Sequence, residues 1–298
     1  MSKYKFASVD IGGTNTRFAL IEEGKILKKI KFETNQKNYS QTLDHLISLL
    51  KEYEINALAL CIPGPADYKN GIIFKSPNLS GWENLNVKQY ILERHFLEAI
   101  VFENDANVMA LSNHYTHLGT QNDVTQFFTV STGLGAGLVI KNKIFTGYNY
   151  IAQEIAKIPL GNVYEEGFHL PPYSAELFAS GTGIELRYKL YSNKNLKAKE
   201  IFDLYKKDPL ATKIIDEGIL TLAKVIATSI AFNNPSIMSF GGSVTNNNLW
   251  FVKEAINLAK NFTDIKQFEV VNFNFDQHGD DSALIGLDYL IKDTIAGF

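Results

Sequence analysis

Three short segments hold most of the residues whose types and spacing could do chemistry. Two are glycine-rich turns, Asp10 to Arg17 and Ser131 to Gly137, and the third is the acidic segment Glu103 to Asn107. Glycines let the backbone approach a ligand closely, so bare amides and neighbouring hydroxyls in such turns can bind phosphate oxygens. Carboxylates beside them can accept a proton or hold Mg²⁺. Together these groups are typical of phosphoryl transfer.

The first turn reads Asp-Ile-Gly-Gly-Thr-Asn-Thr-Arg from Asp10 onward. Gly12, Gly13 and Thr14 are candidate phosphate contacts, with the hydroxyl of Thr16 as a further one. Asp10 ends an expected strand, and its carboxylate can hold Mg²⁺ directly or through water. A simple hairpin corner would use the same residue types, so this turn alone leaves both interpretations open.

The second turn has a Gly-x-Gly-x-Gly core that begins at Gly133. A dinucleotide fingerprint needs Gly-x-Gly-x-x-Gly followed by a helix. Here Leu138 to Ile140 favour a strand, so the segment does not meet that requirement. Thr132 and Gly133 are instead candidate nucleotide contacts. The two turns together predict a phosphate clamp with two sides.

Asp105 follows an expected strand and begins an expected helix. The first reading of an acidic residue there is an N-cap, which any helix can use. The second reading is catalytic: Asp105 takes the proton from a substrate hydroxyl as that hydroxyl attacks a phosphate.

The order of elements suggests how these groups are positioned. Tyr4 to Val9 reads as a strand that enters the first turn, and Gln126 to Val130 reads as a strand that enters the second. Each opens an α/β half, which predicts a duplicated fold with a cleft between the halves. Helices are expected at residues 39–53, 87–96, 106–117, 174–179, 183–191, 216–232 and 282–295, and further strands at 17–21, 25–32, 57–62, 100–103, 138–140 and 234–240.

Composition excludes several classes of protein. The chain has 298 residues, a net charge of −3, 45% hydrophobic residues and one cysteine, Cys61. That length suits two domains. A single cysteine rules out an intrachain disulfide and a cysteine-rich zinc site. No basic surplus marks a nucleic-acid binder, and neither a signal peptide nor an apolar run of about 18 residues is present. We therefore expect a cytoplasmic protein without nucleic-acid or membrane partners.

Taken in order, the motifs resemble the ROK family of sugar kinases, which includes bacterial glucokinases, N-acetylmannosamine kinases, fructokinases and related repressors. The resemblance runs from one end of the chain to the other. The matching segments are residues 10–17, 63–65, 76–79, 103–110, 131–140, 154–155, 179–181, 241–242 and 279–283.

The resemblance implies an actin-like (ribonuclease H-like) two-domain fold that closes on a sugar and Mg-ATP. The smaller domain would comprise residues 1–117 and 283–298, and the larger one residues 118–282. The resemblance also makes Asp105 the catalytic base and suggests a homodimer. The sugar contacts would be Gly64, Asn78, Asn104, Asp105, Glu154, Lys157 and Glu176, and the nucleotide contacts Asp10, Gly12, Gly13, Thr14, Thr132, Gly133 and Gly242, with Asp10 also holding Mg²⁺.

The chain departs from the family after Glu154. Many members have a zinc-binding histidine where this chain has Lys157, and they add three cysteines that are absent here. His169 alone does not make a structural zinc site, so we expect none. Packing of aromatic and proline side chains is the expected substitute in the loop 159–173. Lys157 has two readings, an exposed replacement or a contact to the sugar's anomeric or 2-position.

These departures favour N-acetylmannosamine as the acceptor, with glucose or another hexose as the alternative. A repressor of this family would carry an added N-terminal helix-turn-helix, and the first turn begins too early for one. A non-catalytic sugar-binding regulator is a more remote alternative, because Asp10 and Asp105 are both present.

Overall fold

The computed structural model describes residues 4–22, 24–76, 79–166 and 168–296. The chain divides into two compact units. The first comprises Met1–Ser112, Thr146–Ile151 and Asp280–Phe298, and the second Asn113–Phe145 and Ala152–Gly279. The division falls within helix α3 (Asp105–Thr116), so this helix contributes residues to each unit. The expected domain bounds, residues 1–117 with 283–298 and residues 118–282, stay a prediction.

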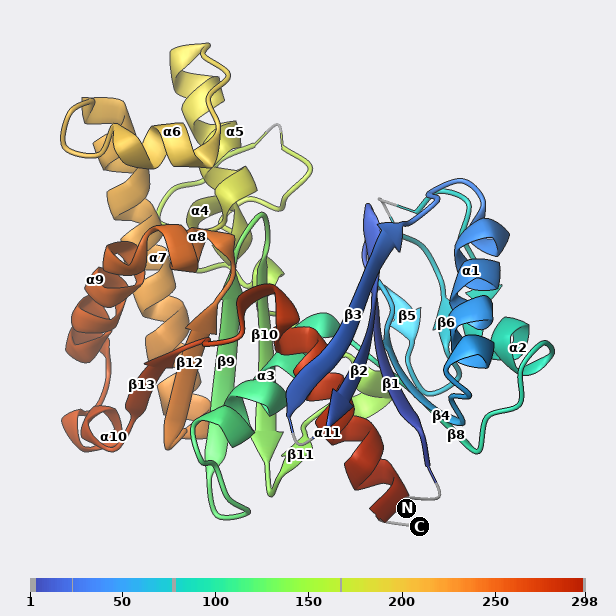
Figure 1. The fold of residues 1–298 in the computed structure, drawn as a ribbon. Helices are drawn as coiled ribbons and strands as arrows, with labels where there is room; N and C mark the ends of the chain where they lie inside the picture. Colours follow the sequence, from blue (N-terminus) through green and yellow to red (C-terminus); the bar gives the residue numbers. More distant parts are fainter. Residues whose placement is uncertain (1–3, 23, 77–78, 167, 297–298) are drawn as a thin grey trace. The chain divides into compact units, whose positions relative to one another are not determined.

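The first unit is built on a five-stranded sheet in the order β3-β2-β1-β4-β8 (Figure 1). The pairs β3–β2 and β2–β1 are antiparallel, and β1–β4 and β4–β8 are parallel. The strands are β1 (Phe6–Ile11), β2 (Asn15–Glu22), β3 (Lys25–Glu33), β4 (Ala57–Cys61) and β8 (Ala99–Glu103). A small three-stranded sheet accompanies them, with β5 (Ala66–Asp67), β6 (Ile72–Ile73) and β7 (Leu85–Asn86).

Helices cover both faces of the first sheet. The apolar face of α1 (Tyr39–Glu52) shares a core with β1 and β4, because Leu43, Leu46 and Leu50 recur at helical spacing. On the opposite face, Ala19 and Ile21 of β2 pack against the helix α11 (Ser282–Ala296). A short helix, α2 (Val87–Leu92), completes this unit. The chain thus returns at its C-terminal end to finish the core of the first unit.

The second unit repeats the sheet, in the order β11-β10-β9-β12-β13 with the same sequence of antiparallel and parallel pairs. The strands are β9 (Val124–Val130), β10 (Leu134–Ile140), β11 (Lys143–Ile144), β12 (Ile237–Gly241) and β13 (Asn272–Phe275). This repetition confirms the duplicated α/β fold expected from the two glycine turns.

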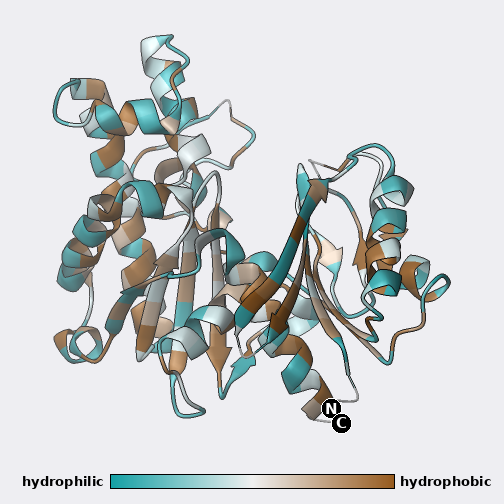
Figure 2. Ribbon diagram, viewed as in Figure 1, coloured by the Kyte–Doolittle hydropathy of each residue, from teal (hydrophilic) through white to brown (hydrophobic). Residues whose placement is uncertain are grey.

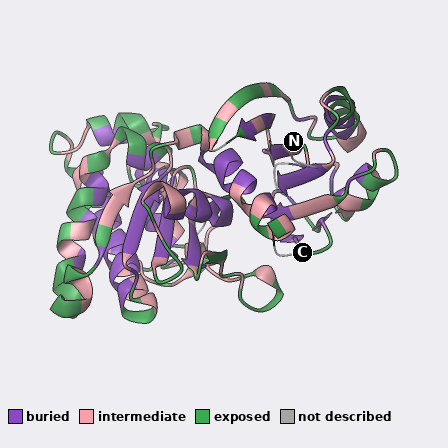
Figure 3. Ribbon diagram, turned by 60° about the horizontal axis from the view of Figure 1, so that its bottom comes forward, coloured by how far each residue is buried: buried purple, intermediate pink, exposed green. Residues whose placement is uncertain are grey.

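A long helix, α7 (Pro209–Asn233), contributes many buried residues to the core of the second unit. It packs against α4 (Ala175–Ala179), α5 (Gly181–Ser192) and α9 (Leu249–Ala259). The remaining helices are α6 (Ala198–Asp203), α8 (Ser243–Asn247) and α10 (Ile265–Glu269), with 3₁₀ turns at Tyr148–Tyr150, Ile155–Lys157, Lys260–Phe262 and Gly279–Asp281. Figure 2 shows many hydrophobic residues on the strands and on parts of the helices, and Figure 3 shows much of the strands buried, in line with the fully buried strands β4 and β12.

Candidate functional site

The parallel strands of the first unit bring its acidic residues to one edge of the sheet. Asp10 of β1 pairs in register with Cys61 of β4, and Cys61 pairs with Glu103 of β8. Asp105 follows two residues after Glu103, at the start of α3. Because the carboxyl ends of parallel strands share one edge, Asp105, the predicted base, and Asp10, the predicted Mg²⁺ ligand, lie within range of each other's charge.

Asp10 has a strongly perturbed carboxyl group. Its pKa is raised to about 6, first by burial and then by the negative charges of Asp105 and Asp280, while Arg17 lowers it in part. Arg17 stands opposite Asp10 on β2, with its guanidinium 3.6 Å from the carboxylate. The same guanidinium donates a hydrogen bond of 2.6 Å to the backbone oxygen of Asp280. Asp10 is therefore surrounded by negative charge that one arginine offsets only in part.

Asp105 combines solvent access with a close protein environment. Its side chain is exposed, and the surrounding protein nevertheless raises its pKa through desolvation, which the backbone N–H of Ala106 partly offsets. The side chain of Asn104 also accepts a hydrogen bond from Ala106, at 2.9 Å, as a capping residue does. Since Asn104 takes this role, the N-cap reading does not account for Asp105.

Tyr68 is a residue of this edge that the sequence analysis missed. Its hydroxyl accepts a hydrogen bond of 3.3 Å from the side-chain amide of Asn104. A Cβ atom at Gly64 would lie 2.8 Å from the same hydroxyl, so a side chain there would require the tyrosine to shift. The structure thus joins two predicted sugar contacts, Gly64 and Asn104, through one tyrosine. The only advance signal was its position shortly after the Pro-Gly-Pro segment. The third predicted contact here, Asn78, lies outside the described residues.

The first turn is a tight corner closed by a hydrogen bond within its own backbone. The N–H of Gly12 donates to the oxygen of Asn15 at 3.0 Å. Thr14 is exposed at the tip, as expected for a phosphate contact. Thr16 is buried in β2, and its hydroxyl pairs with that of Thr34 at 2.9 Å. The expectation that Thr16 could face phosphate was therefore wrong, because the strand resumes at Asn15 and turns this side chain inward.

The second turn is shorter than expected. Strand β10 begins at Leu134, so only Ser131 to Gly133 form the corner, and the expected extension to Gly137 was wrong. The N-terminal end of α5 is attached to this corner. Gly181 donates to the oxygen of Ser131 at 2.8 Å, and Thr182 donates to that of Thr132 at 3.0 Å. Thr132 itself is exposed at the corner.

Gly242 lies beside the same corner. It follows β12, which runs parallel to β9, and its φ of +95° falls in the region that side chains disfavour. A Cβ atom there would lie 2.5 Å from the backbone oxygen of Val130. The structure therefore brings Thr132, Gly133 and Gly242 together at one edge of the second sheet.

Glu176 of α4 is attached to the second turn. Its carboxylate accepts a hydrogen bond of 3.3 Å from the N–H of Leu134. Burial raises the pKa of Glu176, the positive charges of His169 and Lys157 lower it, and Glu154 raises it. The structure thus places Glu154, Lys157 and Glu176, the three predicted sugar residues of this unit, within one electrostatic neighbourhood, and it adds His169.

The described side chains offer few ligands for a metal ion. Within the described ranges there is no group of three or more His, Cys, Asp or Glu side chains placed to hold a metal ion. Mg²⁺ commonly needs only one or two carboxylates, since water and substrate phosphates supply its other ligands. Asp10, with excess negative charge around it, fits that limited role. Among the same residues, no helix is long and apolar enough to cross a membrane.

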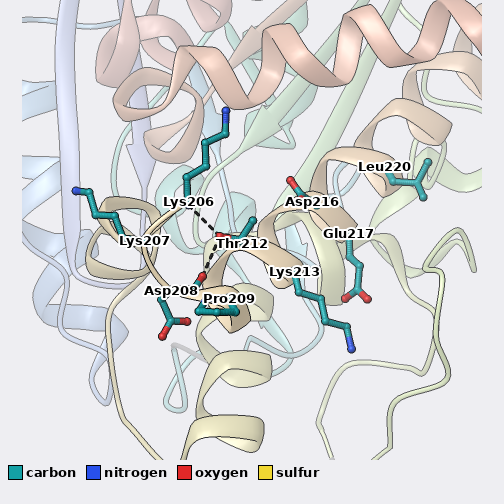
Figure 4. A pocket seen from close by; sticks show the side chains of 9 residues that line it. All are labelled: Lys206, Lys207, Asp208, Pro209, Thr212, Lys213, Asp216, Glu217 and Leu220. Atoms are coloured by element: carbon teal, nitrogen blue, oxygen red, sulfur yellow. Dashed lines mark hydrogen bonds between the residues drawn. The ribbon is translucent and has the colours of Figure 1, made fainter.

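A surface cavity of ≈ 760 Å³ lies elsewhere, at the N-terminal end of α7 (Figure 4). It is lined by lysines and acidic residues, none of which was predicted as a site residue. Its carboxylates already have partners: Asp208 caps α7, Asp216 accepts from Tyr205, and Glu217 pairs with Arg187. These carboxylates are therefore engaged in contacts within the second unit.

The ROK family profile matches residues 6–294. The chain belongs to the ROK family. A glucokinase of Thermotoga maritima is 29% identical over 82% of this chain and 84% of its own. An N-acetylmannosamine kinase of Haemophilus influenzae is 27% identical over 97% and 95%, and an N-acetyl-D-glucosamine kinase of Aliivibrio fischeri is 26% identical over 95% and 98%. The chain is a sugar kinase of this family.

Solved structures show the same fold. The ROK hexokinase of Thermus thermophilus superposes with a TM-score of 0.85 at 22% identity and covers 99% of this chain and 100% of its own. The ROK glucokinase of Streptomyces griseus, solved with glucose and AMPPNP, gives 0.71 at 22% identity over 97% and 99%. The fold is the actin-like two-domain fold of ROK sugar kinases, as the sequence analysis predicted.

Proposed function

We propose that this ROK sugar kinase transfers the γ-phosphate of ATP to the 6-hydroxyl of a hexose, with N-acetylmannosamine as its acceptor. One observation carries the reaction type. An accessible carboxylate, Asp105, lies near a second carboxylate whose pKa is raised to about 6, on the edge where β1 and β8 end. Phosphoryl transfer requires such a base next to a position that suits a cation.

In the proposed reaction, Asp105 takes the proton from the 6-hydroxyl of the sugar. The sugar oxygen attacks the γ-phosphorus and forms the new P–O bond, while the bond from that phosphorus to the bridging oxygen breaks and ADP leaves with its electrons. Asn104 and Gly64, which Tyr68 ties together, orient the sugar beside the base. Positioning of this kind supplies much of the rate enhancement.

The nucleotide is assigned to residues of both glycine turns. Gly12, Gly13 and Thr14 would contact phosphate in the first unit, and Thr132, Gly133 and Gly242 in the second. Asp10 would hold Mg²⁺, which neutralises phosphate charge when it is bound. The surroundings of Asp10 support this role, because burial and then the charges of Asp105 and Asp280 raise the pKa of its carboxyl, and a bound cation would offset that unfavourable negative charge. Use of ATP also favours a cytoplasmic enzyme.

The acceptor is assigned to the charged group around Glu176. Glu154 and Glu176 would hold sugar hydroxyls, and Lys157, which is exposed, would reach the 2-position that carries the acetamido group in N-acetylmannosamine. The similarity to an N-acetylmannosamine kinase along nearly the whole of both chains supports this choice. Glucose is the second candidate, supported by the 29% identity to a glucokinase.

The test is an ATP-coupled assay with N-acetylmannosamine, glucose, N-acetylglucosamine, mannose and fructose. We expect kcat/KM for N-acetylmannosamine to exceed that for glucose by at least about 10-fold, which corresponds to about 1.4 kcal/mol of transition-state discrimination. A preference for glucose would select the second candidate. Turnover of none of these sugars would reject the proposed function in favour of a sugar-binding regulator.

The family resemblance also suggests a homodimer. Light scattering of the purified chain at several concentrations would test this. A mass of one chain, independent of concentration, would reject the dimer without affecting the proposed reaction.

A further inference from the structure

The segment from Ile158 to Tyr173 connects residues that act on Glu176 and carries little regular structure. Apart from a bridge between Pro159 and Ser174, its described residues form neither helix nor strand. We call this segment the 158–173 loop. It leaves directly from Lys157 and ends just before α4, which bears Glu176, and it contains His169. Its conformation therefore decides where the charges around Glu176 lie.

A carboxylate in the middle of this loop is almost completely buried. The side chain of Glu165 is 2% exposed, although its neighbours Tyr164 and Glu166 are exposed. An ionised carboxylate in such a place requires an opposite charge and good hydrogen bonds. The guanidinium of Arg187 on α5, itself 1% exposed, provides both, because its Nε donates to both oxygens of Glu165, at 2.9 and 3.0 Å. The hydroxyl of Tyr191 donates a further hydrogen bond of 3.3 Å to the same carboxylate.

Arg187 joins the loop to two further helices. Its Nη2 pairs with Glu217 on α7. Its guanidinium also lies over the ring of Phe178, at 4.2 Å from the ring centre. Phe178 belongs to α4, two residues after Glu176. One arginine therefore contacts the loop, α7 and the helix that bears the proposed sugar-binding glutamate.

The base of the loop is fixed to the same helices. The N–H of Gly161 donates to the oxygen of Tyr173 at 2.7 Å, which closes the loop on itself. A Cβ atom at Gly161 would lie 2.3 Å from the ring of Phe178, so the backbone packs directly on α4. Lys224 of α7 donates to the side chain of Asn162 at 2.6 Å. These contacts hold the start of the loop, whereas Glu165 is the buried attachment of its middle.

We propose that the Glu165–Arg187–Glu217 ion cluster is a positioning device for the sugar side of this kinase. The cluster holds the 158–173 loop against α4 and so keeps Lys157 and His169 beside Glu176. This inference rests on the proposed function, in which Glu176 binds the sugar. Glu165, Arg187 and Glu217 are positioning residues and make no contact with substrate.

The three members are not equivalent. The Arg187–Glu165 pair is enclosed, whereas the side chain of Glu217 is 17% exposed and lines the cavity shown in Figure 4. Solvent can compensate Glu217 if the pair is lost, but it cannot reach Glu165. The cluster therefore predicts a graded response, with the larger effect at Glu165 and the smaller one at Glu217.

The experiment compares Glu165→Gln with Glu166→Gln in the full chain. Glu166 is the adjacent loop residue, exposed and bonded to Tyr164, so its replacement is a matched control. In Glu165→Gln we expect backbone hydrogen exchange across the loop to rise at least about 10-fold and KM for the sugar to rise about 10-fold. KM for ATP should change less than about 2-fold, and Glu217→Gln should give an intermediate result.

Unchanged exchange in the loop, or an equal rise of both KM values, would overturn the positioning role. If Glu165→Gln fails to fold, Arg187→Lys replaces it, since this variant keeps the charge but has no planar guanidinium to contact Glu165 and Glu217 together. The exchange measurement needs no sugar, so it decides the anchoring of the loop on its own. If the wild-type chain turns over no sugar, the proposed function fails. If the wild type is active and the variant keeps its sugar KM, this inference fails.

Discussion

The corner between β1 and β2 and the corner between β9 and β10 occupy the same place in two sheets of identical strand order. In each corner we compare the second residue pair from the turn. This pair is Asp10 opposite Arg17 in the first sheet and Thr129 opposite Gly135 in the second. The parallel neighbour of Asp10 is Cys61, and that of Thr129 is Gly241. The scaffold is thus repeated while its side chains are not.

This difference suggests that the two corners contribute differently to the reaction, the first through charged side chains and the second through backbone groups. The first corner carries a carboxylate, an arginine and, nearby, Asp105, so we propose that proton transfer and cation binding belong there. The second corner has small residues at the equivalent positions and relies on backbone groups from β9, α5 and the segment after β12. A duplicated fold can divide a reaction in this way because each copy keeps the geometry while its side chains change freely.

The sharpest test of this division is Asp105→Asn. The asparagine keeps the shape but cannot take the proton, so kcat should fall by about 10²–10⁴-fold, while the KM for sugar stays measurable. Steady-state kinetics with the preferred sugar would check this. Near-normal turnover would mean that the acid–base work lies elsewhere.

A smaller effect is expected from adding a methyl group to the second corner. In Gly242→Ala the new Cβ meets a backbone oxygen and the φ angle is unsuited to alanine, so KM for ATP should rise about 10-fold and stability fall by about 1–3 kcal/mol.

Gly12→Ala provides the comparison in the first corner. Its Cβ would lie 3.1 Å from the oxygen of Asn15 without a left-handed φ, so the loss of stability should be smaller. Thermal unfolding and ATP kinetics of both variants would show whether Gly242→Ala is the more damaging of the two. A larger loss in Gly12→Ala would contradict it.

The negative charge of Asp10 in the first corner should lower the free energy of unfolding at neutral pH. Because the pKa of Asp10 is raised from 3.8 to about 6 in the folded chain, the folded state binds this proton more readily than the unfolded state does. The stabilisation from that proton is complete below about pH 4 and is lost as the pH rises through about 6. Asn does not titrate, so Asp10→Asn should be more stable than wild type by about 1–3 kcal/mol at pH 7.

This gain should vanish near pH 4, and urea unfolding at both pH values without Mg²⁺ or ATP would measure it. An equal gain at both pH values would show that charge is not its cause.

The smallest effect is expected from treatment with a zinc chelator, because we expect the chain to hold no structural zinc. If the Glu165–Arg187 pair holds the 158–173 loop, treatment with a zinc chelator that is removed before assay in excess Mg²⁺ should leave Tm and sugar KM unchanged. Elemental analysis of the purified chain should then find much less than one zinc per chain. One zinc per chain, lost together with activity, would contradict this.

The repeated strands were predictable because their hydrophobic patterns are local. Other features depended on contacts that a single segment does not contain. Leu134 to Gly137 are rich in glycine and resemble a turn, yet pairing with β9 makes them strand. Helix α7 was expected to begin at Asp216 and begins at Pro209, after the capping residue Asp208, a signal that the sequence analysis overlooked. Helix α9 and strand β13 were not predicted.

The candidate site shows the same limit. Glycines and acids in compact motifs were predicted from their own segments. Tyr68 gained its place only when Asn104 and Gly64 came together around it. Packing of aromatic and proline residues was expected to order residues 159–173, and the rings of Tyr164 and Tyr173 do pack together, with their centres 5.4 Å apart. The buried attachment of the 158–173 loop, however, joins Glu165 to a residue on α5 and another on α7, and no local pattern indicates such pairs.

The return of α11 to the first sheet has a consequence for how the chain is made. The ribosome completes residues 1–112 long before residues 280–296 exist, yet Leu284 and Ile285 are needed to cover Ala19 and Ile21. Gly286 also lies so close to Val108 that an added Cβ would be 1.9 Å from its backbone oxygen, which leaves little room for a substitute. At synthesis rates of about 5–20 residues per second, one face of the first sheet stays uncovered for roughly 10–30 s. A nascent chain of this enzyme therefore offers chaperones an apolar surface that the finished protein no longer has.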